Sequence, residues 1–254
     1  MTVEVNRASL LAELPHGFLG RKGGVSTGVC AGLNVGWGSG DDRAAIAENR
    51  RRAVEAVAPG AALVTVHQVH SPDAIHADAP WPDDARPHAD AIVTDRPGLA
   101  LGVLTADCTP VLFADREAGV IGAAHAGWRG AFGGVIEATI AAMEKRGAVR
   151  GRILAAVGPV IARKSYEVDD GLLRRFAEAD PENERFFTPG REGHYQFDLE
   201  AYVLARLAEA GMTRAEALGL DTYADPERFF SYRRATHQGE ATYGRQLSLI
   251  ALAR

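Results

Sequence analysis

Residues 99–130 read LALGVLTADCTPVLFADREAGVIGAAHAGWRG, and this stretch decides the fold. It contains three short runs rich in Val, Leu, Ile and Ala, which predict strands over Leu99–Thr105, Val111–Ala114 and Val120–Ala124. Several of these runs are apolar at successive positions, which is the pattern of strands buried on both faces. The connections between them are too short to hold helices, which argues against a sheet built only of strand–helix–strand units.

Further strands and helices flank this stretch on both sides. Additional strands are predicted over Leu63–Val69, Ala91–Thr94, Ile153–Val157 and Gln246–Leu252. Helices are predicted over Arg43–Val57, after the cap candidates Asp41 and Asp42, over Ala131–Lys145, and over Asp198–Ala210, with Asp198 as its cap. Short strands alternating with helices predict a mixed α/β (α+β) protein, and the length fits one domain over residues 1–254.

The bulk composition limits the partners that the chain could bind. Lys and Arg number 28 against 33 Asp and Glu, so the chain lacks the basic excess that nucleic-acid binding exploits. No segment approaches the length of a membrane span, and the first residues lack the pattern of a secretory signal. We therefore expect a cytoplasmic protein that binds neither nucleic acid nor membranes.

Three potential metal ligands follow predicted strands. His70 follows the run that ends at Val69, Cys108 follows the run that ends at Thr105, and His125 follows the run that ends at Ala124. Ligands bind at such strand ends in open α/β sheets. Two imidazoles and a thiolate are three zinc ligands, the number typical of catalytic sites, and they leave a fourth position open.

Each of these residues also has an ordinary structural interpretation. A lone cysteine is usually an inert core residue, and a lone histidine is usually held by hydrogen bonds within the fold. Cys30, the other cysteine, lies in a glycine-rich loop without neighbouring ligands. His67 lies three residues before His70, which on a strand puts the two on opposite faces. The remaining histidines are expected to be solvated: His16, His76, His88, His194 and His237.

Two segments could bind an anion. The turn from His125 to Gly130 leads into a predicted helix, so Arg129 lies beside free helical N–H groups, although it could instead pair with a surface carboxylate. Residues 21–28, RKGGVSTG, combine Arg21 and Ser26 with a backbone that can approach an anion closely. They also match the G-x-S-x-G pattern of serine hydrolases, but the glycine-rich flanks exclude a nucleophile elbow.

Taken together, these motifs resemble the YfiH-like family, also called laccase-domain proteins or peptidoglycan editing factors. The resemblance rests on Gln68-Val69-His70, on residues 106–110, ADCTP, and on residues 125–130, HAGWRG, and it extends over nearly the whole chain. One departure is Tyr243, which replaces the usual Thr before Gly244-Arg245.

The resemblance implies a fold of mixed sheets between helical layers, similar to the catalytic domain of cytotoxic necrotizing factor. It implies that His70, Cys108 and His125 bind the metal, expected to be Zn²⁺, with copper possible in vitro. It also implies an enzyme that phosphorolyses purine nucleosides and deaminates adenosine, so the partners are a nucleoside and phosphate. The candidate catalytic residues are Cys108, Asp107 and Arg129, and the candidates for binding substrate or phosphate are Arg21, Ser26, Gln68 and Arg129.

Three other functions compete with nucleoside chemistry. The editing-factor name suggests a hydrolase that removes a wrong amino acid from a nucleotide-linked cell-wall precursor. The laccase name suggests a copper polyphenol oxidase, but 8 histidines without an H-x-H pair are a poor basis for a multicopper cluster. A non-enzymatic interaction protein would leave the three ligands without a purpose.

Overall fold

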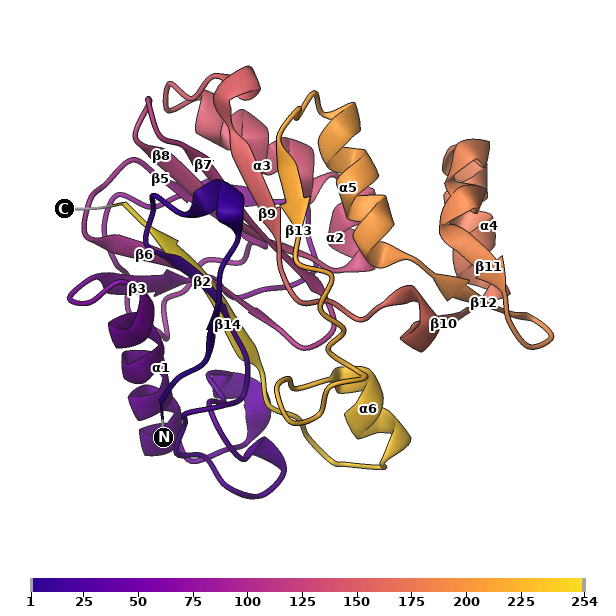
Figure 1. The fold of residues 1–254 in the computed structure, drawn as a ribbon, viewed down its shortest axis with the longest axis horizontal. Helices are drawn as coiled ribbons and strands as arrows, with labels where there is room; N and C mark the ends of the chain where they lie inside the picture. The colour runs from indigo at the N-terminus through magenta and orange to yellow at the C-terminus, as the bar shows by residue number, and fades with distance from the viewer. Residues whose placement is uncertain (1, 253–254) are drawn as a thin grey trace.

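The computed structural model of the protein describes residues 2–252 and contains two large mixed β-sheets and a small one (Figure 1). The five-stranded sheet has the order β1 (Val5–Asn6), β2 (His16–Leu19), β14 (Gln246–Ala251), β6 (Leu99–Thr105) and β3 (Ala62–Thr65). The six-stranded sheet has the order β13 (Ala215–Ala217), β9 (Leu154–Val157), β7 (Thr109–Asp115), β8 (Val120–Ala126), β5 (Ala91–Thr94) and β4 (Ala74–His76).

The two large sheets pack face to face because their strands are apolar on both sides. Leu101 and Val103 of β6 share one core with Leu112 of β7 and Ile121 of β8, so this core lies between the sheets. Alternate residues of the same strands point the other way. The sequence pattern of doubly buried strands is thereby confirmed.

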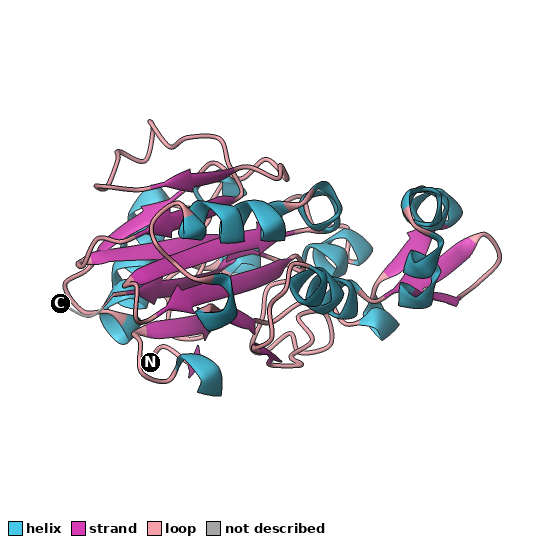
Figure 2. Ribbon diagram, turned by 90° about the horizontal axis from the view of Figure 1, so that it is seen from above, coloured by secondary structure: helices cyan, strands magenta, loops and turns pink. Residues whose placement is uncertain are grey.

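Helices cover both outer faces of this pair of sheets (Figures 1 and 2). Helix α1 (Arg43–Val57), capped by the Asp42 side chain, packs its apolar residues against the outer face of the five-stranded sheet. The outer face of the six-stranded sheet is covered by α2 (Trp128–Gly133), α3 (Val135–Glu144) and α5 (Leu199–Glu209). The predicted mixed fold, with sheets between helical layers, is therefore confirmed.

A small unit projects from one end of the molecule (Figure 2). It consists of the sheet β10 (Glu167–Asp169), β12 (His194–Phe197) and β11 (Phe187–Pro189), together with α4 (Asp170–Ala179). Phe176 of α4 joins it to the body, because its ring contacts Phe132 of α2 and Tyr202 of α5, with centroids 4.8 and 4.9 Å apart. A last short helix, α6 (Tyr232–His237), precedes β14.

Several predicted boundaries were wrong. The helix predicted over Ala131–Lys145 is two helices, because Gly134 has φ 101°, ends α2 and begins α3. The strand predicted over Leu63–Val69 ends at Thr65, because the chain then leaves the sheet and the His67 N–H bonds to the Pro87 carbonyl.

The prediction that His16 is solvated was also wrong. His16 is fully buried in β2, where its Nε2 accepts a hydrogen bond from the Ala8 N–H.

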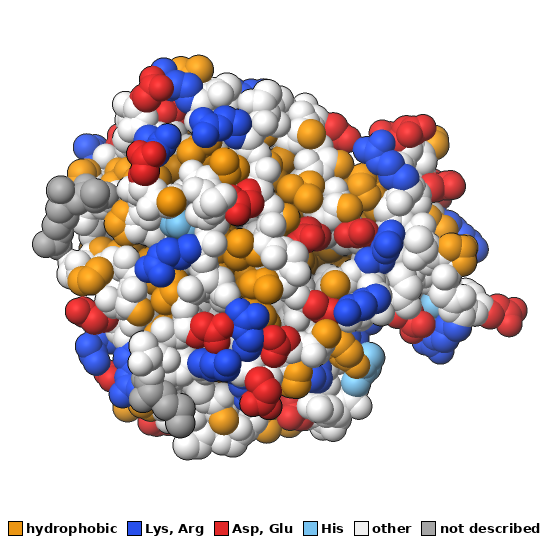
Figure 3. Space-filling view, in the orientation of Figure 1, with side chains coloured by type: hydrophobic (Ala, Val, Ile, Leu, Met, Phe, Trp, Pro, Cys, Tyr) orange, Lys and Arg blue, Asp and Glu red, His pale blue; other side chains and the backbone are white. Residues whose placement is uncertain are grey.

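The surface carries both signs of charge side by side on the face seen in Figure 3, as the near balance of acidic and basic residues predicts. Among residues 2–252, none of the helices combines the length and the apolar character needed to cross a bilayer.

Candidate metal centre

The three predicted metal ligands come from separate segments and lie together. His125 is on β8, Cys108 is in the connection between β6 and β7, and His70 is in the loop after β3. Their ligand atoms all lie within 4.8 Å of one another. Because β6 belongs to the five-stranded sheet and β7 to the six-stranded sheet, the group lies where the chain crosses between the sheets.

This position corrects the strand-end interpretation of the sequence. His125 lies within β8, opposite Pro110 of β7, because pairing continues to Ala126 beyond the apolar run that marked the strand. Cys108 directly precedes β7, and His70 lies beyond the end of β3 at Thr65. The three candidate ligands therefore lie where the two sheets meet and not along the edge of a single sheet.

The donor set fits a single tetrahedral metal ion. Cys108 Sγ lies 3.8 Å from His70 Nε2, and the rings of His70 and His125 meet edge to face with centroids 4.8 Å apart. Ideal zinc bond lengths of about 2.3 Å to sulfur and about 2.0 Å to nitrogen put two such ligands roughly 3.6 Å apart. Small side-chain shifts would therefore complete the geometry, with one position left for a further ligand.

A buried carboxylate that sequence reasoning missed organises both histidines. Asp90 is fully buried, and its Oδ1 accepts a hydrogen bond of 2.7 Å from His125 Nδ1. Its Oδ2 accepts from the N–H groups of Val69 and Ser71, at 3.0 and 2.7 Å, which are the two neighbours of His70. With Nδ1 engaged, His125 presents Nε2 to the site, the arrangement usual for metal-binding histidines.

The local electrostatics favour a thiolate at Cys108. Burial alone would raise the pKa of this thiol, but the charge of His125 and hydrogen bonds from His125 and His70 outweigh burial and lower the pKa to about 6. Burial opposes the charged form of His125 as well, yet the thiolate and Asp90 raise the pKa of His125 to about 9. A thiolate is the form of cysteine that binds metals.

The backbone is strained around the same group. Among residues 2–252, His70 and Asp107 are the non-glycine residues with positive φ, at 62° and 88°. Each such conformation costs on the order of 1–3 kcal/mol and persists where surrounding contacts hold it. Gly127 supplies space, since a Cβ there would lie 2.9 Å from both Cys108 Sγ and the His70 ring.

Asp107, predicted as a catalytic residue, has its carboxylate engaged elsewhere. It is buried and accepts hydrogen bonds from the hydroxyls of Thr222 and Ser231 and from the N–H of Arg233, at 2.7, 2.9 and 2.7 Å. Burial raises the pKa of this carboxyl. The contacts show a residue that ties the Cys108 turn to the C-terminal segment.

Gln68 lies where it was expected, in a cavity of about 300 Å³ that the three candidate ligands also line, here called the triad cavity. Its side-chain amide, however, pairs with the backbone of Leu104: Nε2 donates to the carbonyl at 2.7 Å, and Oε1 accepts from the N–H at 2.8 Å. These two bonds fasten the loop that carries His70 to the end of β6.

Arg21 and Ser26 do not line the triad cavity. The Arg21 guanidinium donates to the carbonyls of Ala31 and Pro226 and lies 4.7 Å from the Phe230 ring. Ser26 Oγ accepts from Asn49 Nδ2 at 2.8 Å, and its backbone pairs with Gly32. A 3-10 turn over Gly28–Cys30 follows Ser26, and no strand-to-helix elbow is formed there, as the glycine-rich flanks predict.

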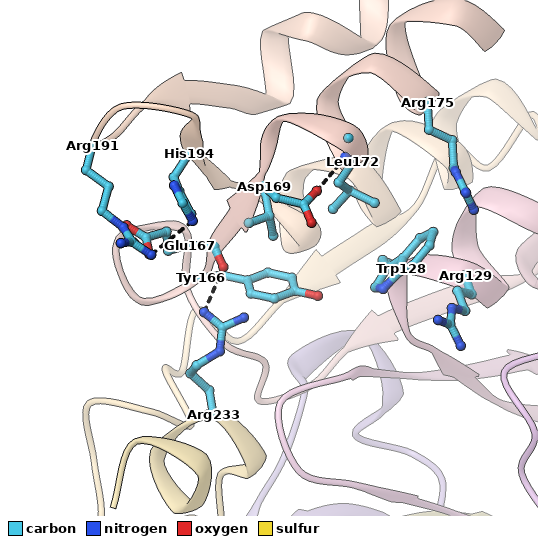
Figure 4. A pocket seen from close by; sticks show the side chains of 12 residues that line it. Trp128, Arg129, Tyr166, Glu167, Asp169, Leu172, Arg175, Arg191, His194 and Arg233 are labelled. Carbon is cyan, nitrogen blue, oxygen red and sulfur yellow. Dashed lines mark hydrogen bonds and ion pairs between the residues drawn. The ribbon is translucent and has the colours of Figure 1, made fainter.

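Arg129 lines a second and larger cavity of about 640 Å³, which lies between α2 and the small unit (Figure 4). Its guanidinium lies 5.1 Å from the Trp128 ring, and that of Arg175 lies 5.6 Å from the same ring. Within residues 2–252 no carboxylate forms an ion pair with Arg129, which removes the surface-pair alternative.

The structure is that of a mixed α/β protein with two stacked sheets and a candidate three-ligand group, His70, Cys108 and His125, where the sheets meet. Residues 15–253 match the family described as multi-copper polyphenol oxidoreductase laccase, and the chain belongs to this family.

Its relatives and structural neighbours agree with this assignment. A purine nucleoside phosphorylase of Deinococcus radiodurans is 42% identical, and the match covers 98% of this chain and 92% of that protein. Among solved structures, YlmD of Geobacillus stearothermophilus has a TM-score of 0.90 at 29% identity, covering 100% of this chain and 97% of that one. YfiH of Bacillus licheniformis has a TM-score of 0.87 at 26% identity, covering 99% and 96%. The resemblance to the YfiH-like family is thereby confirmed.

Proposed function

We propose that the protein is a zinc-dependent purine nucleoside phosphorylase whose reaction takes place in the triad cavity. Phosphate would displace the purine from the sugar, so that the glycosidic C–N bond breaks, a C–O bond to phosphate forms, and the free base leaves with a proton. The observation that carries the proposal is the cluster of His70, Cys108 and His125 on the wall of a cavity of about 300 Å³, a volume within the range of small-molecule sites. The name of the Deinococcus radiodurans relative supports the choice of substrate.

His70 Nε2, Cys108 Sγ and His125 Nε2 would hold the ion. When bound, zinc supplies a Lewis acid with one open coordination position. The chain contributes the orientation: Asp90 sets the tautomer of His125 and the position of His70, and Gly127 leaves room beside the sulfur. Deamination of adenosine would be a different reaction at the same site: water would attack C6 of the purine, the C–N bond to the amino group would break, and ammonia would leave.

Copper oxidase chemistry has less support, despite the description of the family. Among residues 2–252, the only other group with metal-ligand spacing is His76, Asp78 and Asp95, and Arg96 already pairs with both of these carboxylates. A multicopper cluster needs several neighbouring sites rich in histidine.

The decisive experiment incubates protein of defined metal content with adenosine, with and without phosphate, and identifies the products. Adenine and ribose 1-phosphate, formed only with phosphate, are expected. Inosine as the main product would assign deamination. No reaction with adenosine, together with release of an amino acid from a nucleotide-linked cell-wall precursor, would replace the proposal with the hydrolase.

A matched pair of cysteine variants tests the metal. Cys108→Ala removes one of three ligands, so both zinc content and turnover should be lost. Cys30→Ala removes the same atoms from a buried position outside the triad and should retain both, at a packing cost of about 1 kcal/mol. Zinc bound at one ion per chain in the Cys108 variant would contradict the ligand assignment.

A further inference from the structure

One arginine in the triad cavity lacks an anionic partner. Arg245 lines this cavity, and its Nη2 donates a hydrogen bond of 2.9 Å to the Tyr243 hydroxyl. Its guanidinium carbon lies 4.4 Å from the centre of the Tyr243 ring. Nη1 is buried and has no hydrogen-bond acceptor, and none of the carboxylates in residues 2–252 forms an ion pair with this side chain.

Two more unsatisfied donors belong to residues that line the same cavity. Trp37 Nε1 and Thr105 Oγ1 are both buried without a hydrogen-bond partner, and Thr105 is only 2% exposed. Buried polar atoms without partners are rare in folded proteins. Three of the seven such side-chain atoms among residues 2–252 belong to residues of this one cavity wall, which is therefore short of hydrogen-bond acceptors.

The other arginines considered for this role are engaged or lie elsewhere. Arg86 lines the triad cavity too, but its Nε donates to the Asp83 carbonyl at 2.7 Å and lies 3.9 Å from the Asp83 carboxylate. Arg21 is bound to backbone carbonyls outside the cavity. Arg129 faces the second cavity (Figure 4). Arg245 is therefore the cation that can accept a charged ligand beside the candidate metal ligands.

We propose that Arg245 binds the phosphate co-substrate, with Tyr243 as its positioning residue. The proposal rests on the phosphorolysis proposed above. A guanidinium offers two parallel N–H donors that match a phosphate, and a charge-assisted bond is stronger than a neutral one. The Arg245 guanidinium lies over the Tyr243 ring, and its Nη2 donates a hydrogen bond to the Tyr243 hydroxyl, so Tyr243 holds the guanidinium by two contacts. Gly36 permits close packing against the same side chain, since a Cβ there would lie 3.0 Å from Arg245 Cδ and 3.1 Å from Nη1.

The test compares Arg245→Gln, Tyr243→Phe and Gly36→Ala with the parent in the metal-loaded enzyme. Arg245→Gln should raise the KM for phosphate about 10- to 100-fold, with the KM for nucleoside changed less than about threefold. Tyr243→Phe and Gly36→Ala should each raise the KM for phosphate by a smaller factor. Arg43→Gln is the control, because it removes an exposed positive charge that lies on the Trp37 ring and not on the cavity wall.

A binding measurement makes the result independent of turnover. Inorganic phosphate should raise the melting temperature of the parent and of Arg43→Gln, and it should not do so for Arg245→Gln. If Arg245→Gln fails to fold, the Gly36→Ala variant decides by the same two readouts.

Two outcomes would overturn the assignment: a phosphate response unchanged in these variants but lost in Arg129→Gln, or no response of the parent at any phosphate concentration. Phosphate binding that depends on Arg245 without any phosphorolysis would instead refute only the proposed reaction.

Discussion

At the scale of single residues, one carboxylate connects ligands that come from distant parts of the chain. Asp90 bonds to the His125 side chain and to the backbone on both sides of His70. These two backbone bonds hold His70 in its positive-φ conformation, which is strained for a residue other than glycine. Precise placement of the candidate ligands therefore depends on a residue that would not itself touch the metal.

Replacing this carboxylate should loosen the site without removing a ligand. Asp90→Asn keeps the shape but offers one acceptor oxygen, so zinc affinity should fall about 10- to 100-fold, as is typical when the partner of a ligating histidine is lost. Competition with a chelator of known affinity measures the change. Asp73→Asn, at an exposed position in the same loop, should bind zinc like the parent. Equal affinities in the two variants would show that Asp90 only supports the fold.

The reactivity of the thiol should titrate at unusually low pH in the metal-free protein. The lowered pKa means that the thiolate fraction rises through pH about 6 and is nearly complete at neutral pH, whereas an ordinary thiol titrates near 8.5. Alkylation rates measured against pH in a Cys30→Ala background should therefore show a midpoint near 6. Adding His125→Gln should move the midpoint up, since it removes the main charge that lowers the pKa. A midpoint above 8 in the first variant would contradict the charge pairing.

At the scale of elements, the residue that leads into α2 determines how much space is left around the candidate metal ligands. Gly127 precedes the first turn, with φ −64° and ψ 163°, values that other residues also adopt. A glycine is required there for space, because the Cys108 sulfur and the His70 ring lie so close. A second glycine, Gly134, is required for its backbone conformation and separates α2 from α3.

Two glycine substitutions test the need for space at Gly127, with Gly133 as the control. Gly127→Ala should displace Cys108 or His70 and reduce zinc content, although the backbone accepts alanine. Gly133→Ala places its Cβ 3.7 Å from the Pro72 side chain, an ordinary contact, and should retain zinc while adding about 0.5–1 kcal/mol to the free energy of unfolding. Elemental analysis and urea unfolding measure both effects. Full zinc content in Gly127→Ala would show that the centre has more room than the contacts indicate.

At the scale of the whole molecule, stacking of the two sheets creates the centre, and an aromatic cluster holds the small unit against the body. Phe176 lies in the middle of that cluster, within 5.5 Å of the ring centroids of Phe187, Phe197 and Tyr202. None of the three candidate ligands belongs to this aromatic cluster. We therefore expect that a substitution in the cluster lowers the stability of the small unit without changing the metal content.

Phe176→Ala should therefore lower the free energy of unfolding by about 3–5 kcal/mol, the usual cost of truncating a buried aromatic residue. Zinc content should stay the same. Arg174→Ala, on the exposed face of α4 where Arg174 pairs with Asp170, should cost less than about 0.5 kcal/mol. Loss of zinc in the folded Phe176 variant would show that the small unit also supports the centre.

The sequence by itself determined the central helices and strands and the three candidate ligands, but it did not predict the small unit, strands β1, β2, β4 and β13, or helix α6. Helix α1 and strands β5 and β6 have the predicted boundaries, because caps and apolar runs act over a few neighbouring residues. Only the tertiary structure decided which side chains meet. Asp90 and His125 are separated by 35 positions in the chain, and Arg245 reaches the triad cavity from the start of the last strand. Periodicity reports which face of a strand is buried but not what lies against it, and the stacking of two sheets supplies that information.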